Sequence, residues 1–226
     1  MKKLNLFKKL GLCALSAALC ASAFAFTACD NDKTDNANNE QKQEQPAAFS
    51  LTAAEWDAAM ALGFDYSFVE NVTFGAGTMS LEQTVAGNSI KQVDTLNGSE
   101  YYFEKDGENY YRYEKQNDKW TKSNTTKEIF DSLNEGLVGF KGKFGNFTFN
   151  GTDTYTCDSL KAFTSSGTYR TEILMKNIKI KFNANKKVEK VDCVMYSGST
   201  ESDNSSTISI AFDYSQKTIT LPQIAE

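Results

Sequence analysis

Three regions can be told apart from the order of apolar and polar residues along the chain. Residues 10–26 are uncharged and mostly apolar or small, whereas residues 30–45 are almost all polar. From residue 49 onward, apolar residues recur first at helical spacing and then in alternation with polar ones. Such alternation is typical of half-buried strands. We therefore predict a single, mainly β domain over residues 49–226, preceded by a segment that is not part of it.

Two short segments have the signature of a helix start. Thr52 and Glu55 stand at the spacing of a capping box, in which the hydroxyl and the carboxylate each accept a backbone N–H group. This pair predicts a helix from about residue 52 to residue 62. Thr125 and Glu128 have the same spacing and predict a second helix.

The remaining pattern predicts strands. The segments FDYSFVENVTF (64–74) and TMSLEQTV (78–85) each place their apolar residues on one face, and short polar turns separate further segments of this kind. Closely spaced strands joined by polar turns indicate an antiparallel sheet, here of about ten or eleven strands. A sheet of that size curls, closes or splits. The expected fold class is α+β and mostly β, with one large curved antiparallel sheet, a half-barrel, and two helices on its concave face.

One predicted hairpin is aromatic on both faces. The dipeptide Asp106-Gly107 is a strong signal for a two-residue turn. With that turn, Phe103 faces Tyr110 on one side of the hairpin and Tyr102 faces Tyr111 on the other. We expect one face to pack on the helices or to line a cavity, and the other to be partly exposed, as the polar tip of tyrosine allows.

The first 28 residues have the layout of a secretory signal peptide. Four lysines fall within the first nine residues, and the uncharged run 10–26 follows. The tripeptide Phe26-Thr27-Ala28 before Cys29 is similar to the lipobox of bacterial lipoproteins. This resemblance implies that residues 1–28 are removed and that the thiol of Cys29 carries a diacylglyceryl group with chains such as palmitate.

The lipid anchor determines the expected location. The protein is expected to be exported and anchored to the outer face of the cytoplasmic membrane, which is either the cell surface or the periplasmic side. Residues 29–48 contain too few apolar side chains to order themselves by burial, so we interpret them as the lipidated cysteine and a disordered polar tether. The expected partner is therefore the membrane, through the N-terminal lipid anchor.

Composition argues against several classes of function. The chain has 29 acidic and 24 basic residues, and four of the lysines lie in the predicted signal peptide, so a nucleic-acid partner is not expected. The absence of histidine excludes Ser-His-Asp and Cys-His catalysis and zinc sites that use histidine. Acidic residues are so frequent that close pairs arise by chance. We expect no enzyme, no cofactor and no metal, and a monomer.

Two cysteines, Cys157 and Cys193, lie in predicted strands of the domain. Two interpretations stay open. In an exported protein the two thiols can pair as a disulfide, or each can be an ordinary buried thiol that packs as a small hydrophobic side chain.

The order of elements resembles that of the LolA/LppX-like lipoproteins and lipoprotein carriers. The resemblance covers roughly residues 49–222 and depends on a helix, strands, the segment GENYYRYEKQNDKW, a second helix, further strands and the closing FDYSQKTITLP. It implies a half-open barrel whose concave face holds acyl chains. The expected function is then that of a membrane-anchored lipoprotein that binds a lipid or another hydrophobic ligand.

The helix stripe and the first two strands supply the candidate wall of such a site. The candidate ligand-binding residues are Trp56, Met60, Phe64, Phe68, Met79 and Leu81. The alternative is a structural or protein-interaction module of the cell envelope with a filled core and no ligand. That alternative predicts an exposed patch formed by the outer aromatic residues Tyr102, Tyr111 and Tyr113.

Overall fold

The computed structural model describes residues 49–226 except 76, 167–168, 199, 202–204 and 225–226. The predicted signal peptide, Cys29 and the predicted tether all lie outside the described residues. The side chains of residues 163–171 are likewise not described.

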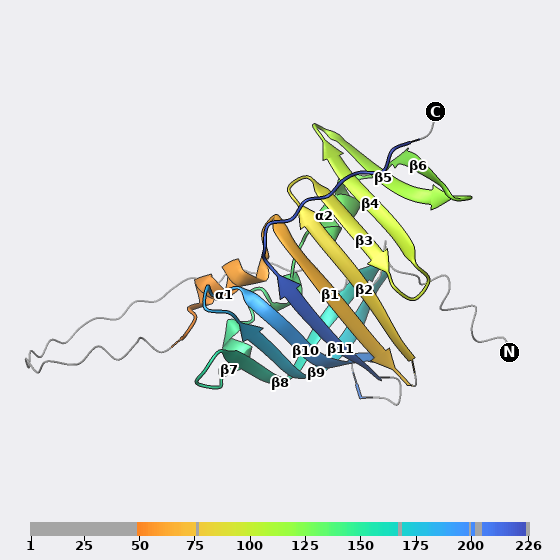
Figure 1. Cartoon of the computed structure of the whole chain (residues 1–226). Coiled ribbons are helices and arrows are strands. Elements are labelled where there is room, and N and C mark those ends of the chain that lie inside the picture. Colours follow the sequence, from red (N-terminus) through yellow and green to blue (C-terminus); the bar gives the residue numbers. More distant parts are fainter. Residues whose placement is uncertain (1–48, 76, 167–168, 199, 202–204, 225–226) are drawn as a thin grey trace, which may run out of the picture.

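One antiparallel sheet of eleven strands dominates the structure (Figure 1). It is not closed, because β6 and β7 form its two edges, and β1 pairs with β11 in its middle. The order across the sheet is β6-β5-β4-β3-β2-β1-β11-β10-β9-β8-β7. The expected fold class is confirmed. The strands are β1 (Asp65–Phe74), β2 (Gly77–Ala86), β3 (Ser89–Asp94), β4 (Ser99–Asp106), β5 (Asn109–Gln116), β6 (Lys119–Asn124), β7 (Thr148–Phe149), β8 (Thr154–Ser166), β9 (Tyr169–Phe182), β10 (Val188–Ser197) and β11 (Ser205–Asp213).

Helix α1 (Ala53–Met60) begins as the sequence predicts. The Thr52 hydroxyl accepts the Glu55 N–H at 3.2 Å, and the Glu55 carboxylate accepts the Thr52 N–H at 2.8 Å. The buried face of the helix contains Trp56 and Met60, both fully shielded from solvent. The Trp56 ring packs on the rings of Phe147 and Tyr155, with centroids 4.7 and 5.4 Å away. This helix therefore seals the end of the concave face formed by β7–β10.

Helix α2 (Lys127–Leu133) begins one residue later than the predicted capping box. Its N-cap is Thr126, whose hydroxyl accepts the Ile129 N–H, so the prediction of Thr125 as the cap was wrong. The reason is that Thr125 still belongs to the sheet pairing, because its N–H donates to the Tyr110 carbonyl at 2.9 Å. On its buried face, α2 places Phe130 in contact with the strands at the β3–β5 end of the sheet.

After α2 the chain returns across the concave face through two short 3₁₀ helices, η1 (Val138–Phe140) and η2 (Phe144–Asn146). The Leu137 N–H donates to the Met60 carbonyl at 2.8 Å, which ties this segment to the end of α1. Gly136 makes the approach possible, since it has a φ of +70° and an added Cβ would lie 2.6 Å from the Met60 carbonyl oxygen.

The β4–β5 hairpin has the predicted faces but a shifted register. Phe103 pairs with Arg112, and Tyr102 pairs with Tyr113, so the predicted pairs with Tyr110 and Tyr111 were wrong. The turn residues are Gly107 and Glu108 in place of Asp106-Gly107. Gly107, with a φ of 58°, occupies the first central position, where a type II′ turn favours glycine. The shift moves each partner by two positions and leaves every side chain on its predicted face.

Candidate ligand pocket

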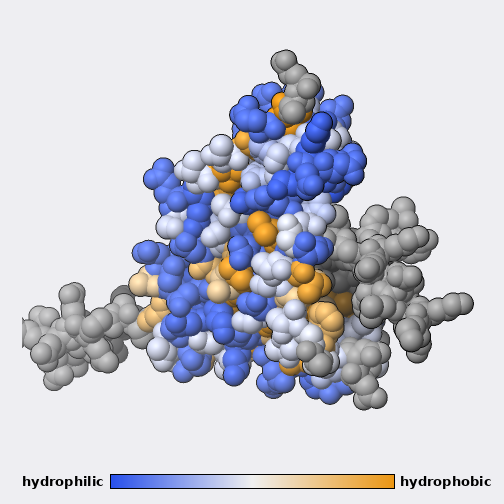
Figure 2. Space-filling model, turned by 45° about the vertical axis from the view of Figure 1, so that its right-hand side comes forward, coloured by the Kyte–Doolittle hydropathy of each residue, from blue (hydrophilic) through white to orange (hydrophobic). Residues whose placement is uncertain are grey.

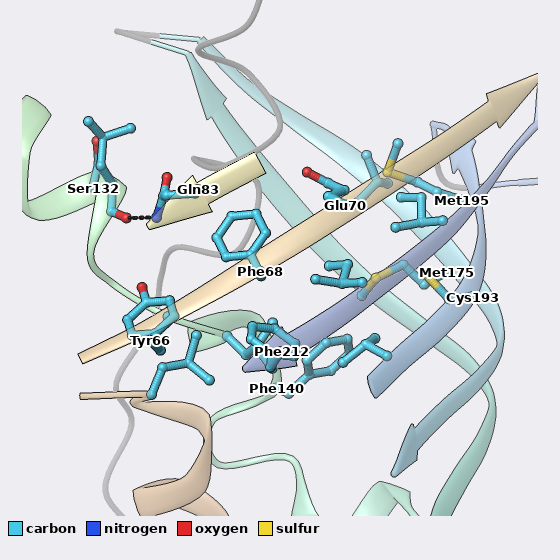
Figure 3. Close-up of a pocket in the computed structure, with 18 residues that line it drawn as sticks. Tyr66, Phe68, Glu70, Gln83, Ser132, Phe140, Met175, Cys193, Met195 and Phe212 are labelled. Carbon is cyan, nitrogen blue, oxygen red and sulfur yellow. Dashed lines mark hydrogen bonds between the residues drawn. The ribbon is translucent and has the colours of Figure 1, made fainter. Parts of the chain in front are cut away.

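A cavity of about 80 Å³ lies on the concave face of the sheet, beneath the segment that follows α2 (Figure 3). Strands β1, β2, β9, β10 and β11 form its floor, and the end of α2 together with residues 136–140 forms its roof. Most of the wall is apolar, from aliphatic, aromatic and sulfur-containing side chains. The wall contains four aromatic rings, those of Tyr66, Phe68, Phe140 and Phe212.

The cavity arises where two hydrophobic clusters meet. One cluster surrounds α1 and the strands β7–β11, and the other lies between α2 and the strands β1–β4. Leu62 and Phe212 contact both clusters, and both residues also line the cavity. Since each helix covers only its own end of the sheet, the region over β1 and β11 is roofed by the connecting segment alone. The cavity is therefore a consequence of two short helices on one long sheet.

The aromatic side chains of β1 and β11 form one continuous wall. Tyr66 and Phe68 project from β1 to the same side, as the period of two in a strand requires (Figure 3). The Phe68 ring lies 5.8 Å from that of Phe212 and 6.5 Å from that of Tyr66. The Tyr66 hydroxyl donates to the Asn134 side-chain oxygen at 3.4 Å. Burial raises the pKa of Tyr66, so its hydroxyl remains neutral.

Glu70 is the one acidic residue among the described residues of this wall. It follows Phe68 on the same face of β1, is 6% exposed, and stands opposite Leu81 on β2 and Ile210 on β11. Within the described residues, its carboxylate makes no hydrogen bond and no ion pair. Burial raises the pKa of the Glu70 carboxyl to about 7. A carboxyl group in such surroundings is costly to ionise unless a partner arrives.

The other three polar residues that are buried as a whole, Gln83, Gln92 and Asp94, each make a hydrogen bond. The Gln83 amide donates to the Leu133 carbonyl at the end of α2, at 2.8 Å. Gln92 donates to the Gln83 side-chain oxygen, also at 2.8 Å, and Asp94 accepts the Leu96 N–H at 2.9 Å. Glu70 therefore differs from these three residues in lacking a partner among the described residues, as do the Tyr214 hydroxyl and one Glu135 oxygen elsewhere in this region.

Sulfur atoms occupy the β9–β10 side of the cavity. Met175 of β9 pairs with Met195 of β10, and Cys193 lies two residues before Met195, so all three face the cavity. Thioethers adapt to ligands of different shape. Burial, with a smaller contribution from Glu70, raises the pKa of the Cys193 thiol to about 12, which keeps it neutral. Of the two interpretations of the cysteines, the structure shows free, buried thiols at both Cys157 and Cys193.

The six candidate wall residues from the sequence fall in different places, and Phe68 is the one that lines this cavity. Trp56 and Met60 are fully buried in the cluster around α1. Leu81 is buried, Met79 is half-buried against the same cluster, and Phe64 is 67% exposed.

Sequence reasoning did not single out Glu70. It treated the acidic residues as a group whose close pairs carry no information. A signal was nevertheless present, because the alternation that puts Phe64, Tyr66 and Phe68 on one face also puts Glu70 there.

The convex face of the β3–β6 region also carries aromatic residues, but these are covered. Tyr102 and Tyr113 are buried, and Tyr111 is half-buried. The ammonium group of Lys122 lies 3.7 Å from the centroid of the Tyr111 ring, and Trp120 packs edge-on against Tyr102 at 5.4 Å. The molecular face in Figure 2 shows its hydrophobic residues in several small groups separated by polar ones.

In the part of the chain that the structure describes, no helix is long and apolar enough to cross a membrane. The same residues contain no group of three or more cysteine, aspartate or glutamate side chains that could hold a metal ion. No protein-family model matches the sequence, and no curated protein matches it.

Proposed function

We propose that this protein is a membrane-anchored extracytoplasmic lipoprotein, of the LolA/LppX-like type, that binds a hydrophobic ligand in the cavity on the concave face. The observation that supports the proposal is an apolar cavity that strands from both halves of the sheet line, and among its described wall residues one polar group, the Glu70 carboxyl, lacks a partner. Apolar pockets with few polar groups are the usual form of small-molecule sites.

The size of the cavity limits how the ligand binds. An engineered apolar cavity of about 150 Å³ accepts benzene, and this cavity has about half that volume. It holds one end of a ligand, and a whole acyl chain requires the roof to move. The roof is suited to such movement because α2 has only seven residues and the 3₁₀ helices after it have three each.

A cavity-filling substitution tests ligand binding. Cys193→Leu adds apolar volume to the wall, whereas Val194→Leu adds it on the opposite face of the same strand and serves as the matched control. The full chain is purified from membranes, extracted with organic solvent and analysed by mass spectrometry. We expect an apolar compound in wild type and in the control, reduced at least about fivefold in Cys193→Leu. Equal amounts in all three, or none in wild type, would contradict the proposal.

The anchor is tested separately, by labelling growing cells with radioactive palmitate. Wild type and Cys20→Ser, whose substitution lies within the predicted signal peptide, are expected to incorporate the label, whereas Cys29→Ser is not. Label retained in Cys29→Ser, or absent from wild type, would contradict acylation at Cys29.

The alternative function, a protein-interaction module, depends on the convex aromatic residues. Tyr111 and Trp120 are its best remaining contact points, since both are half-buried, whereas Tyr102 and Tyr113 are closed off by their neighbours. Loss of a co-purifying protein in Tyr111→Ser, with the cavity compound retained, would favour this alternative.

A further inference from the structure

The unpartnered carboxylate of Glu70 is the feature of the cavity that ligand binding by apolar burial alone does not explain. Leu81 and Ile210 flank Glu70 on the neighbouring strands. A site that bound its ligand by apolar burial alone would be better served by an apolar residue at this position. A buried carboxylate without a partner destabilises the protein. A ligand that supplies the missing partner would remove this cost.

The described residues offer no positive group to the cavity. No lysine or arginine is among the described residues that line it. The titratable side chains that share the wall with Glu70 are Tyr66 on β1 and Cys193 on β10, and both stay neutral. The described wall residues thus supply no charge to balance an ionised Glu70, and a ligand that carries a positive charge would supply it.

The rest of the wall suits a cation as well. The four rings of Tyr66, Phe68, Phe140 and Phe212 surround the same small space. Ammonium groups are attracted to the faces of aromatic rings, and aromatic cages recognise them in other proteins. The aliphatic and thioether side chains that complete the wall accept a hydrocarbon chain.

We propose that the cavity binds the ammonium end of an amphiphilic amine, with the Glu70 carboxylate as its counter-ion and the aromatic rings around it. The inference rests on the proposed function, whose ligand class it specifies. An ammonium group with its first carbons fits a cavity of about 80 Å³, and the remainder of the hydrocarbon lies along the apolar roof. Alcohols of the same length make one hydrogen bond without the charge, and carboxylates meet a like charge.

Calorimetric titration of the full chain in a non-ionic detergent tests the assignment. The probes are hexylammonium, 1-hexanol and hexanoate, each corrected for its heat of titration into detergent alone. We expect hexylammonium to bind at least about tenfold more tightly than hexanol, and hexanoate to bind most weakly. Glu70→Gln, which keeps the shape of the side chain, should lower the hexylammonium affinity at least about tenfold and change that of hexanol less than about twofold.

Glu82→Gln is the matched control, because Glu82 is exposed on β2 and does not line the cavity. It should leave all three affinities unchanged. Equal binding of hexylammonium and hexanol, or an unchanged hexylammonium affinity in Glu70→Gln, would overturn the ammonium assignment while the apolar site remains. Failure of all three probes to bind wild type would overturn the assignment and count against the proposed function as well.

Discussion

Two glutamates among the aromatic residues of the convex face, Glu100 and Glu104, have partners within the protein, whereas Glu70 on the concave face has none among the described residues. On the convex face, Glu104 accepts the Tyr113 hydroxyl at 2.6 Å and pairs with Lys122 at 3.2 Å. Glu100 pairs with Lys91 at 2.6 Å. On the concave face, Glu70 makes no such contact within the described residues.

The two faces differ in whether their buried or half-buried carboxylates already have partners. A charge that is paired and partly hydrated needs no further partner, so the convex aromatic region is stable as it stands. A buried, unpaired carboxyl group shifts its pKa upward or takes a partner from outside. The comparison therefore favours the cavity over the convex face as the place where this protein binds something.

The largest expected effect concerns Glu70 and pH. Its pKa rises from 4.5 in the unfolded chain to about 7 in the folded protein, so folding favours the protonated form. The stability associated with this group is complete below pH 4.5 and is lost as the pH rises through 7. At pH 8 the ionised form costs about 3 kcal/mol, at 1.36 kcal/mol per unit of pKa shift.

Glu70→Gln removes this cost. We expect the free energy of unfolding of the variant to exceed that of wild type by about 3 kcal/mol at pH 8, with the excess largely gone at pH 4.5. Tyr66 and Cys193, which share the cavity wall, remain neutral throughout this pH range. They therefore do not contribute to the change of the free energy of unfolding with pH. Urea unfolding at several pH values measures this difference in the free energy of unfolding, with Glu82→Gln as the control. A pH-independent difference between Glu70→Gln and wild type would mean that the carboxyl group has a partner.

The next effect concerns Gln83, the satisfied neighbour of Glu70 in the concave layer. Gln83→Leu leaves the Leu133 carbonyl without its donor and the Gln92 amide without its acceptor. We expect a loss of about 2 kcal/mol in the free energy of unfolding at every pH, because buried polar groups lose their hydrogen bonds. Gln116→Leu, on the exposed end of β5, is the control and should be close to neutral. A neutral Gln83→Leu would show that water replaces these contacts.

Local features of the fold were accessible from the sequence, and long-range ones were not. The α1 capping box involves residues three positions apart, and strand alternation depends on near neighbours, so both were predicted correctly. The shift in the β4–β5 turn and the later start of α2 are one-residue choices between adjacent turn or cap residues. These were decided by pairing in the sheet, such as the bond from Thr125 to Tyr110.

The candidate site shows the same limit. Alternation along β1 places Glu70 on the face of Phe68, and this much can be read from the sequence. Whether Glu70 has a partner depends on β11 and β10, which are more than a hundred residues away along the chain. The roof depends on Gly136 lying against the Met60 carbonyl, a contact that no local pattern indicates.

The smallest expected effect lies on the convex face and provides the counterpart to Glu70. Tyr113→Phe removes the hydrogen bond to Glu104 but leaves that carboxylate paired with Lys122 and accessible to water. Because the remaining partner and solvent compensate for the lost donor, we expect a loss of about 0.5–1 kcal/mol in the free energy of unfolding. Tyr111→Phe is the matched control, since within the described residues its hydroxyl makes no hydrogen bond, and it should be neutral. A loss in Tyr113→Phe as large as that in Gln83→Leu would mean that the convex glutamates are as poorly solvated as Glu70. The contrast between the two faces would then no longer favour the cavity as the proposed binding site.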